Sequence, residues 1–454
     1  MGECGGQAVV LKINWFSPLP PAHSGIAYYA SQILPLLASR HEVIAWTDQE
    51  QVAPELSRIV RVAGFERDNP PWRALNDAHI SIYHLGNHGG MHGGIWQVSR
   101  RHAGVVVLHD LCLHDFFAMV FLRILEKPDA YLAALERWYG EDGRHGGEAF
   151  CAGGIGAETM AQRFPLTREA VWGALGVITH SGSALESLRE TPAAPVAALD
   201  FPYAASDESL CRGWMAARSA APGPPYRLVV FGYLSRNRRL GALLEAMASL
   251  GEREQFHLDI YGQLWDESHI QMQIERLGLS LLVNLHGFLP DGQVEEKLST
   301  AHLAINLRYP SMGEASLSQL QFWDYALPTL VTRTGWYASL PEDSAGFVRP
   351  EHEVEDIQAH LRAFLANPGA FREMGERGRQ SLKDHDAGKY VEAMVQFASS
   401  ALEYSPRIPA LHLAGTIGRD LSQWLYPGAS DNGLERASQE IFAMFKGKTR
   451  DRAS

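Results

Sequence analysis

Short runs of apolar residues in the first half of the chain alternate with longer segments whose apolar residues recur at helical spacing. Runs of this length, bounded by turn residues, are typical of buried strands, and the segments between them are typical of helices. Their alternation predicts a parallel β-sheet with helices on both faces. The predicted strands begin at Val9, Glu42, Ile80, Gly104 and Gly176.

The same alternation restarts at Arg227 and predicts a second doubly wound sheet. Three of its strands, RLVVFG, HLDIYG and LVNLHG, end on glycine, at Gly232, Gly262 and Gly287. Glycine at the carboxyl end of a strand lets the backbone come close to a ligand, and this edge is where open α/β sheets bind ligands. Each glycine alone is equally compatible with an ordinary turn.

Composition changes between the two halves divide the chain into four parts. We expect an N-terminal domain over residues 1–205 and a weakly structured linker over 206–225, where AARSAAPGPPY is rich in alanine, proline and glycine. A second domain is expected over 226–396. Residues 397–454 form the expected C-terminal helical extension, which packs back on the N-terminal domain.

Charge and cysteine content exclude several classes of protein. The 454 residues carry a formal net charge of −12, which argues against a nucleic-acid binder because such proteins need a basic surface. It also disfavours strong adsorption to anionic membranes, although a local basic patch still allows peripheral contact. The four cysteines lack metal-ligand spacing and are typical of reduced thiols. They are Cys4, Cys112, Cys151 and Cys211.

Neither a signal peptide nor a transmembrane segment is expected. The N-terminal residues MGECGGQAVV lack a basic region followed by an apolar run. The most apolar window, Val105 to Leu125, is interrupted by His109, Asp110 and other polar residues, so it does not suit a bilayer. We therefore expect a soluble, cytoplasmic protein.

A carboxylate follows a strand and opens a predicted helix in the segment from His302 to Thr332. Glu314 comes after the turn YPSMG, and the helix is expected from Ala315 to Tyr325. Free N–H groups at a helix start can hold a phosphate, while a neighbouring carboxylate can accept hydrogen bonds from hydroxyls. Together they suit a phosphorylated sugar. The alternative is that Glu314 is an ordinary acid of a first helical turn.

Three arginines, Arg236, Arg238 and Arg239, lie at the predicted start of a helix. Cations oppose the helix dipole there, so this cluster is unfavourable unless an anion or an acidic partner is present. A diphosphate would satisfy it, because the arginine fork matches phosphate oxygens. The alternative is a solvated basic turn paired with nearby acids.

Candidate polar residues in the first half follow its predicted strands. HDLCLHD places His109 and Asp110 after a strand, where a histidine can exchange a proton or donate a hydrogen bond. His23-Ser24-Gly25 precedes a helix whose first N–H groups can meet a phosphate. The segment GNHGGMHGG (Gly86 to Gly94) reads as a flexible loop, either binding an acceptor or purely structural. No ligand cluster supports a metal site.

Seven motifs in register resemble retaining glycosyltransferases of the GT-B fold, specifically family 4, over roughly Val9 to Gln396. That family implies an α/β protein with two Rossmann-like, doubly wound domains facing across a cleft, with C-terminal helices. The motifs are FSPLPPAHSGIAYYA, VVLHD, GVITHSGSALESL, FGYLSRNRRLGALLEA, LDIYG, VNLHGFLP and YPSMGEASLSQLQFWDYALPTLVT.

The resemblance implies roles for individual residues. His109, Glu314 and Arg238 would be catalytic. Acceptor-side residues would be His23, Asn87, His92 and Asp110. The residues that would contact the diphosphate, sugar or base of the donor nucleotide sugar are Gly25, Arg236, Arg238, Gly262, Gly287, Phe288, Glu314, Ser316, Leu317 and Ser318.

Two positions depart from the family pattern. Tyr233 stands where an arginine is common, with Arg236 as its substitute. Phe322 stands eight residues after Glu314, where the family usually has a second glutamate that holds the ribose. Ser318 lies one helical turn before Phe322 and could replace part of that contact.

The expected activity is sugar transfer from a nucleotide-diphosphate sugar to a hydroxyl acceptor, with retention of anomeric configuration. The acceptor would be saccharide, lipid-linked or protein-linked, as in bacterial surface-polysaccharide synthesis. The resemblance implies neither a cofactor nor a metal ion. Two alternatives are a non-catalytic partner subunit of another glycosyltransferase and a GT-B-fold nucleotide-sugar epimerase.

Overall fold

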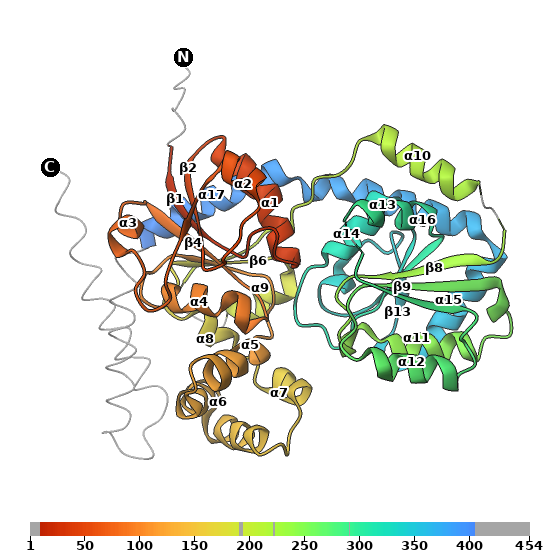
Figure 1. Ribbon diagram of the computed structural model, residues 1–454, viewed down its shortest axis with the longest axis horizontal. Helices are drawn as coiled ribbons and strands as arrows, with labels where there is room; N and C mark the ends of the chain where they lie inside the picture. Colours follow the sequence, from red (N-terminus) through yellow and green to blue (C-terminus); the bar gives the residue numbers. More distant parts are fainter. Residues whose placement is uncertain (1–9, 190–193, 221–222, 290, 405–454) are drawn as a thin grey trace. The chain divides into compact units, whose positions relative to one another are not determined.

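The computed structural model describes residues 10–189, 194–220, 223–289 and 291–404. These residues form two compact units (Figure 1). Unit 1 contains the described residues up to 179, residues 184–199 outside the gap, and residues from 391 onward. Unit 2 contains residues 180–183 and the described part of 200–390.

Unit 1 is built on a sheet of seven parallel strands, and its central strands are buried on both faces. Continuous apolar runs such as VVVL fit this position, because helices cover both sides of the sheet. The sequence missed the short strands β3 and β7. In sheet order the strands are β3 (Arg61–Gly64), β2 (Glu42–Thr47), β1 (Lys12–Phe16), β4 (Ile80–Leu85), β5 (Val105–Leu108), β6 (Gly176–Thr179) and β7 (Val196–Ala198).

Helices follow most strands of unit 1, and α6 and α7 pack together away from the sheet (Figure 1). Residues 182–183 of α9 fall in unit 2, and its remainder falls in unit 1. The helices are α1 (Gly25–Ala38), α2 (Pro54–Ile59), α3 (Trp72–Asn76), α4 (Gly89–Ser99), α5 (His114–Met119), the π-helix η1 (Val120–Ile124), α6 (Pro128–Cys151), α7 (Ala157–Arg163), α8 (Thr167–Val171) and α9 (Gly182–Arg189).

The loop predicted from GNHGGMHGG is wrong for residues from Gly89 onward, which form helix α4. Glycine disfavours helices, but here it allows close packing. A Cβ on Gly89 would lie 2.8 Å from the Met119 Cβ, and one on Gly94 would lie 2.6 Å from an Asp48 carboxylate oxygen. Tertiary packing therefore overrides the low helix propensity.

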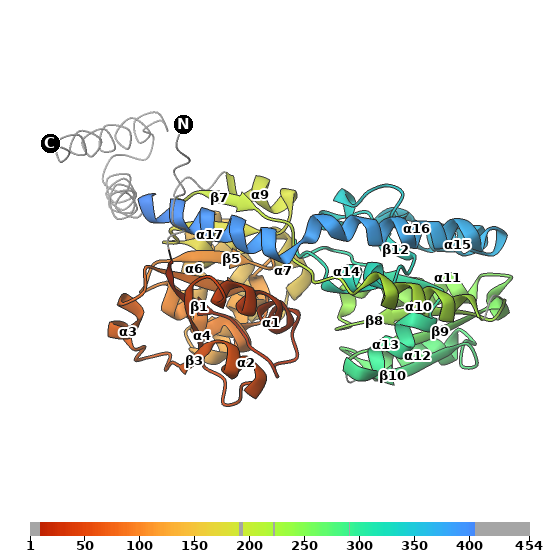
Figure 2. The same ribbon diagram turned by 90° about the horizontal axis from the view of Figure 1, so that it is seen from above.

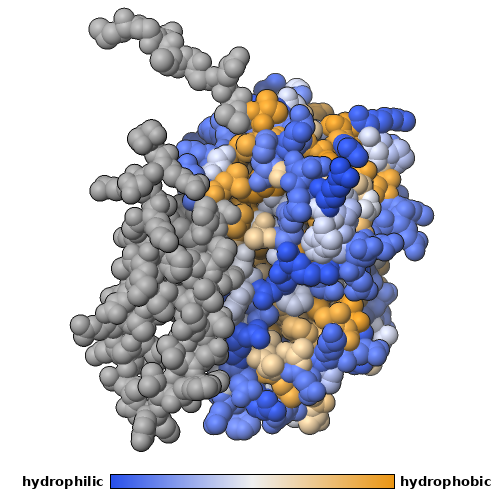
Figure 3. Space-filling view, turned by 90° about the vertical axis from the view of Figure 1, so that its left-hand side faces the viewer, coloured by the Kyte–Doolittle hydropathy of each residue, from blue (hydrophilic) through white to orange (hydrophobic). Residues whose placement is uncertain are grey.

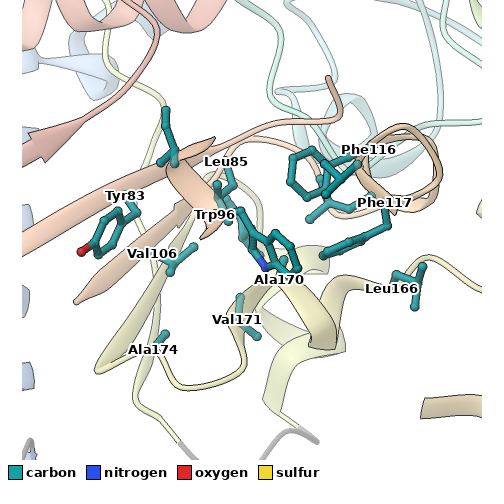
Figure 4. Packing of buried hydrophobic residues seen from close by; sticks show 14 of the residues in the cluster. Tyr83, Leu85, Trp96, Val106, Phe116, Phe117, Leu166, Ala170, Val171 and Ala174 are labelled. Atoms are coloured by element: carbon teal, nitrogen blue, oxygen red, sulfur yellow. The ribbon is translucent and has the colours of Figure 1, made fainter. Parts of the chain in front are cut away.

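One face of the unit 1 sheet packs on α4, α5 and the segment around α8. Figure 4 shows Trp96 of α4 beside Phe116 and Phe117 of α5, with strand residues Tyr83 and Val106 nearby. The Trp96 and Phe117 rings meet edge to face at 5.2 Å. Burial of this aromatic cluster fixes α4 and the carboxyl ends of β4 and β5 in place.

Unit 2 is built on a sheet of six parallel strands, which agrees with the second doubly wound sheet predicted from sequence. Its apolar strand residues face helices on both sides. In sheet order the strands are β10 (Val283–Gly287), β9 (Phe256–Tyr261), β8 (Tyr226–Phe231), β11 (Leu303–Asn306), β12 (Thr329–Thr332) and β13 (Gly346–Val348).

Helices of unit 2 include one that the sequence missed, because residues 208–219 of the expected linker form α10. Trp214 of α10 packs on Tyr325, with ring centroids 4.2 Å apart. The helices are α10 (Glu208–Ser219), η2 (Arg236–Arg238), α11 (Leu240–Ala248), η3 (Arg253–Gln255), α12 (Glu267–Arg276), α13 (Asp291–Thr300), α14 (Leu317–Asp324), η4 (Gly335–Ser339), η5 (Pro350–His352), α15 (Glu353–Ala366), α16 (Pro368–Ser381) and η6 (Leu382–His385).

The last described helix, α17 (Ala387–Tyr404), begins in unit 2 and continues in unit 1 (Figure 2). Within unit 1 it packs on β6, where a Cβ on Gly176 would lie 2.8 Å from the Phe397 ring. Arg40 of α1 also pairs with Glu392 at 2.7 Å. The rest of the expected 397–454 extension lies outside the described residues.

No helix among the described residues is long and apolar enough to cross a membrane. Figure 3 shows one face of the molecule, where the apolar residues among the coloured atoms form separate patches between polar ones. Scattered apolar residues are normal on protein surfaces. We draw no proposal from this face.

Candidate functional site

The edge of unit 2 beyond the carboxyl ends of its strands is lined by glycines. Gly232 follows β8, Gly262 follows β9 and Gly287 ends β10, all with positive φ. Gly262 has φ +132°, and a Cβ there would lie 1.8 Å from the Gly232 carbonyl oxygen. Gly262 is therefore required by the packing of two neighbouring turns.

The arginine cluster does not open a helix as predicted. Arg236–Arg238 form one 3₁₀ turn, Arg239 has left-handed backbone with φ +54°, and α11 begins at Leu240. The Arg236 guanidinium stacks over Trp265, 4.0 Å from the ring centroid. Arg239 pairs with Glu353 at 2.8 Å. For this arginine, the alternative of an acidic protein partner is therefore the one that the structure shows.

Arg238 points elsewhere and is buried, with 3% of its surface exposed. Its Nη1 donates to Asn306 Oδ1 at 2.8 Å and its Nη2 donates to the Phe231 carbonyl at 2.9 Å. Its Nε has no hydrogen-bond partner among the described residues. Burial, with nearby Arg308, lowers the pKa of Arg238 to about 10. It stays charged at neutral pH, and none of the carboxylates in the described part of the chain bonds it directly.

A buried polar chain holds the Arg238 fork in position. Asn306, at the end of β11, donates to Gln319 Oε1 at 2.9 Å, and Gln319 donates to Thr329 Oγ1 at 2.8 Å. All three side chains are fully buried. Satisfied buried networks of this kind are rigid, so the guanidinium has a fixed orientation. Sequence reasoning missed this network because its members are ordinary polar residues spread over three elements.

Glu314 does not open helix α14. The helix begins at Leu317, and Ser316 is its N-cap, with Oγ accepting from Gln319 N at 3.2 Å. Ser316 caps the helix because its hydroxyl satisfies a free N–H group. The interpretation of Glu314 as a first-turn acid is therefore wrong, and so is the expected helix start.

Glu314 instead forms a mostly buried ion pair with Arg308. The Arg308 Nε and Glu314 Oε1 atoms are 2.9 Å apart, with 18% and 12% of the side chains exposed. Glu314 Oε2 also accepts from Met312 N at 2.7 Å. The carboxylate is thereby oriented from two sides. Sequence reasoning missed Arg308, although its place two residues after the end of β11 was an available signal.

Contacts in unit 2 bring several predicted donor residues to one edge. A Cβ on Gly232 would lie 3.2 Å from Ser318 Oγ in the first turn of α14. Arg238 bonds the carbonyl of Phe231, the residue before Gly232. Helix α14 places Ser316 and Leu317 at its N-terminus beside Ser318. A positive charge and a helix start therefore lie next to the same glycine turn.

Other positions singled out for the donor site in the sequence differ in burial and in their neighbours. Phe322 is fully buried in an apolar cluster with Tyr261 and Leu298, so packing occupies the position of the family's usual second glutamate. Phe288, after β10, is 57% exposed. Arg236, over Trp265, has different neighbours from Arg238.

The candidate residues of unit 1 lie where its strands end. Ser24 caps α1 through its Oγ, which accepts from Ala27 N at 3.0 Å, so Gly25 is the first residue of that helix. Both Gly25 and the preceding His23 are exposed. Asp110 Oδ2 accepts from Asn87 N at 2.7 Å, while Asn87 Oδ1 accepts from Phe116 N at 2.9 Å. Asn87 and Asp110 therefore tie together the loops after β4 and β5.

His92 and His109 both contact His84 of β4. His109 Nε2 lies 3.0 Å from His84 Nδ1, and His92 Nδ1 lies 3.0 Å from the His84 carbonyl oxygen. His92 is 1% exposed and His109 is 6% exposed. His92 lies within α4, and its acceptor contact stays a prediction. Burial removes it from solvent.

Buried His92 is expected to make unit 1 sensitive to acid. Burial lowers the pKa of His92 to about 4, so between pH 6.5 and 4 the unfolded chain binds the proton and the folded chain does not. Stability then falls as pH falls, by up to roughly 3 kcal/mol. His92→Asn keeps an N–H near the Nδ1 position without titrating. Urea unfolding at pH 7 and pH 4.5 should show a smaller acid loss in this variant, and an equal loss would contradict the assignment.

Comparison with known proteins gives a family match within the second half of the chain. Residues 215–381 match the family model described as glycosyl transferases group 1. This range contains the unit 2 residues of the candidate donor site. A search of curated proteins found no significant match.

The chain has the GT-B fold. Anabaena HepE in complex with UDP and glucose is similar at 13% identity and TM-score 0.59, over 86% of this chain and 100% of HepE. Sucrose-phosphate synthase from Thermosynechococcus elongatus is 14% identical with TM-score 0.60, over 86% and 98%. WaaG, a glycosyltransferase involved in lipopolysaccharide biosynthesis, is 14% identical with TM-score 0.58, over 85% and 99%.

Metal binding has no candidate among the described residues, where no group of three or more histidine, cysteine, aspartate or glutamate side chains could hold an ion. In unit 2, the features that could contact a ligand include the buried Arg238 charge, the Arg308–Glu314 pair and the start of α14.

Proposed function

We propose that the protein is a retaining glycosyltransferase of family 4, which moves a sugar from a nucleotide-diphosphate donor to a hydroxyl acceptor. The observation that carries the proposal is buried Arg238, whose charge has no directly bonded carboxylate and lies next to the glycine turn and the start of α14. A buried charge without a directly bonded counter-ion is costly, and a diphosphate would supply one. The match to glycosyl transferases group 1 supports the same activity.

Donor activation would depend on charge stabilisation. As the nucleotide leaves, negative charge develops on its diphosphate. The Arg238 guanidinium and the N–H groups of Ser316 and Leu317 would stabilise that charge in place of a metal ion. Their orientation is fixed beforehand by Asn306 and the Ser316 cap, so little reorganisation accompanies the reaction.

Glu314 would accept hydrogen bonds from hydroxyls of the donor sugar. Met312 N and Arg308 hold its carboxylate in one orientation, and a fixed acceptor recognises a sugar hydroxyl better than a mobile one. Departure of the nucleotide leaves an oxocarbenium-like sugar, which the acceptor oxygen would attack from the face that the leaving group vacates, with its proton passing to an oxygen of the departing diphosphate. This order of bond changes retains the anomeric configuration, and no residue is assigned as a covalent nucleophile.

The unit 1 residues would serve the acceptor. His109 and Asp110 follow β5, and Asn87 follows β4, so their polar atoms lie at the carboxyl edge where α/β sheets bind ligands. His109 would contact the acceptor hydroxyl. We propose a cytoplasmic enzyme of surface-polysaccharide or glycoconjugate synthesis, acting on a saccharide, lipid-linked or protein-linked hydroxyl without a cofactor.

A donor panel tests the proposal directly. UDP-, GDP-, ADP- and dTDP-sugars are added to the protein, and the melting temperature is followed because a bound ligand stabilises the folded state. The donor that raises it is then incubated with and without candidate acceptors. Transfer to an acceptor supports the proposal. Conversion of the sugar without acceptor supports an epimerase, and no binding of any donor supports a non-catalytic subunit.

Glu314→Gln is expected to lower kcat/KM for transfer by about 10²-fold, because it removes the negative charge of the carboxylate that accepts a hydrogen bond from the sugar hydroxyl. Affinity for the free nucleoside diphosphate should change less than about threefold, since that ligand lacks the sugar. Initial rates and calorimetry measure the two effects. Glu342→Gln, which alters an exposed ion pair with Arg333, is the matched control. Equal loss of nucleotide affinity and turnover would place Glu314 at the diphosphate instead.

A further inference from the structure

His84 and His109 form a hydrogen-bonded pair of imidazoles at the acceptor edge of unit 1. His84 is the next-to-last residue of β4, and His109 follows the last residue of β5. The strands lie side by side, and His109 N donates to the Leu85 carbonyl at 2.9 Å. His84 Nδ1 and His109 Nε2 are 3.0 Å apart. The backbone and side-chain contacts therefore fix these two rings against each other.

A bond between two neutral imidazoles couples their tautomers. Each neutral ring has one nitrogen that donates and one that accepts. When His84 Nδ1 carries the shared proton, His109 accepts at Nε2 and carries its own proton on Nδ1. When His109 Nε2 carries it, His109 Nδ1 is left as an acceptor. The state of His84 thus decides whether the other nitrogen of His109 donates or accepts.

The surroundings of His84 prevent it from turning. The ring lies against Trp15 at a tilt of 35°, with centroids 4.1 Å apart, and lies 5.2 Å from the Tyr29 ring. Its carbonyl oxygen accepts from buried His92. His84 and Trp15 are fully buried, so His84 has no contact with solvent. Its bond to His109 links it to the residue that is assigned to the acceptor.

We propose that His84 is a positioning residue that holds His109 in a single tautomer and ring orientation, so that His109 presents one defined hydrogen-bonding nitrogen to the acceptor hydroxyl. The assignment of His109 to the acceptor rests on the proposed function. The pairing itself rests on the contacts of unit 1. A purely structural His84 would influence stability without changing the protonation pattern of His109.

Two substitutions separate these roles. His84→Phe keeps a ring against Trp15 but removes the nitrogen that faces His109. His84→Asn places an amide near the position of Nδ1, where it can still donate or accept. His114→Phe is the matched control, because His114 is a fully buried histidine of unit 1 that bonds the Tyr131 hydroxyl at 2.7 Å.

The first measurement needs no substrate. Imidazole ¹⁵N spectra of the full chain, with the His109 signals identified by their loss in His109→Asn, report which nitrogen carries the proton. We expect one neutral tautomer in the native protein and in His84→Asn and His114→Phe, and a mixture in His84→Phe. An unchanged His109 spectrum in His84→Phe overturns the proposal. If that variant does not fold, a native protein that already shows mixed tautomers overturns it instead.

The second measurement is steady-state transfer with the donor found in the panel. His84→Phe is expected to lower kcat by about tenfold or more with donor KM unchanged, because only part of the population holds the productive tautomer. His84→Asn should recover most of this loss. Failure of the native protein to transfer sugar would contradict the proposed function, while the spectra would still decide the pairing. Equal kcat in all three variants would overturn the positioning role.

Discussion

Replacing Arg238 with alanine is expected to lower kcat/KM for sugar transfer by about 10²- to 10³-fold, the usual effect of removing one preorganised charge from a developing anion. Arg238 is buried, is oriented by Asn306 and the Phe231 carbonyl, and has an Nε without a partner among the described residues. The loss should fall mainly on kcat, because the diphosphate charge is greatest as the sugar departs. Initial rates with a verified donor measure it.

Arg349→Ala is the matched control for that variant. Arg349 is an exposed arginine of unit 2 that pairs with Asp356 at 2.7 Å. We expect it to retain turnover within about threefold, because exposed ion pairs contribute little. Melting temperatures of both variants show whether the fold is intact. Normal turnover in Arg238→Ala, or equal losses in both variants, would contradict the role of Arg238 at the leaving group.

Replacing Gly262 with alanine is expected to destabilise unit 2 by about 3 kcal/mol or more. The new Cβ would lie 1.8 Å from the Gly232 carbonyl oxygen, and the backbone has φ +132°. Overpacking and a backbone conformation reserved for glycine each cost roughly 1–3 kcal/mol. Denaturant unfolding of the full chain measures the change, and donor affinity should fall with it, because the two glycine turns form the candidate edge.

Gly278→Ala separates the cost of backbone strain from the cost of overpacking. Gly278 also has positive φ, +67°, but a Cβ there would meet nothing within 4 Å. Only backbone strain remains, so the loss should be about 1 kcal/mol. If both variants lose the same stability, the close packing of Gly262 on Gly232 does not matter to the fold.

Much of the fold follows from the apolar pattern of the sequence. The buried runs of β1, β2, β4, β5 and β6, and of β8 to β12, are long and apolar enough to be read directly, whereas the three-residue strand β13 was missed. The short edge strands β3 and β7 are partly exposed and were missed. Helix α4 was missed because packing against Met119 and Asp48 selects glycine at helical positions, a tertiary effect that local propensity does not contain.

The sequence predicted which residues belong to the candidate site better than it predicted the contacts that they make. Arg238 and Glu314 were identified from motifs, but the motifs do not reveal which residues contact them. Asn306 contacts Arg238 from the end of β11, far along the chain, and Arg308 contacts Glu314 across a turn. The helix start was placed too early because Glu314 precedes Ser316, whose hydroxyl caps the helix instead. A one-dimensional pattern does not distinguish which of two nearby polar residues caps a helix.

The path of the chain through the two units limits how the molecule can be dissected. Helix α17 starts in unit 2, but its later part covers β6 through Phe397 and pairs with Arg40 through Glu392. A fragment ending near residue 200 would therefore lack a helix that belongs to its own core. Separate production of unit 1 requires residues from 391 onward to be supplied in trans or rejoined by circular permutation.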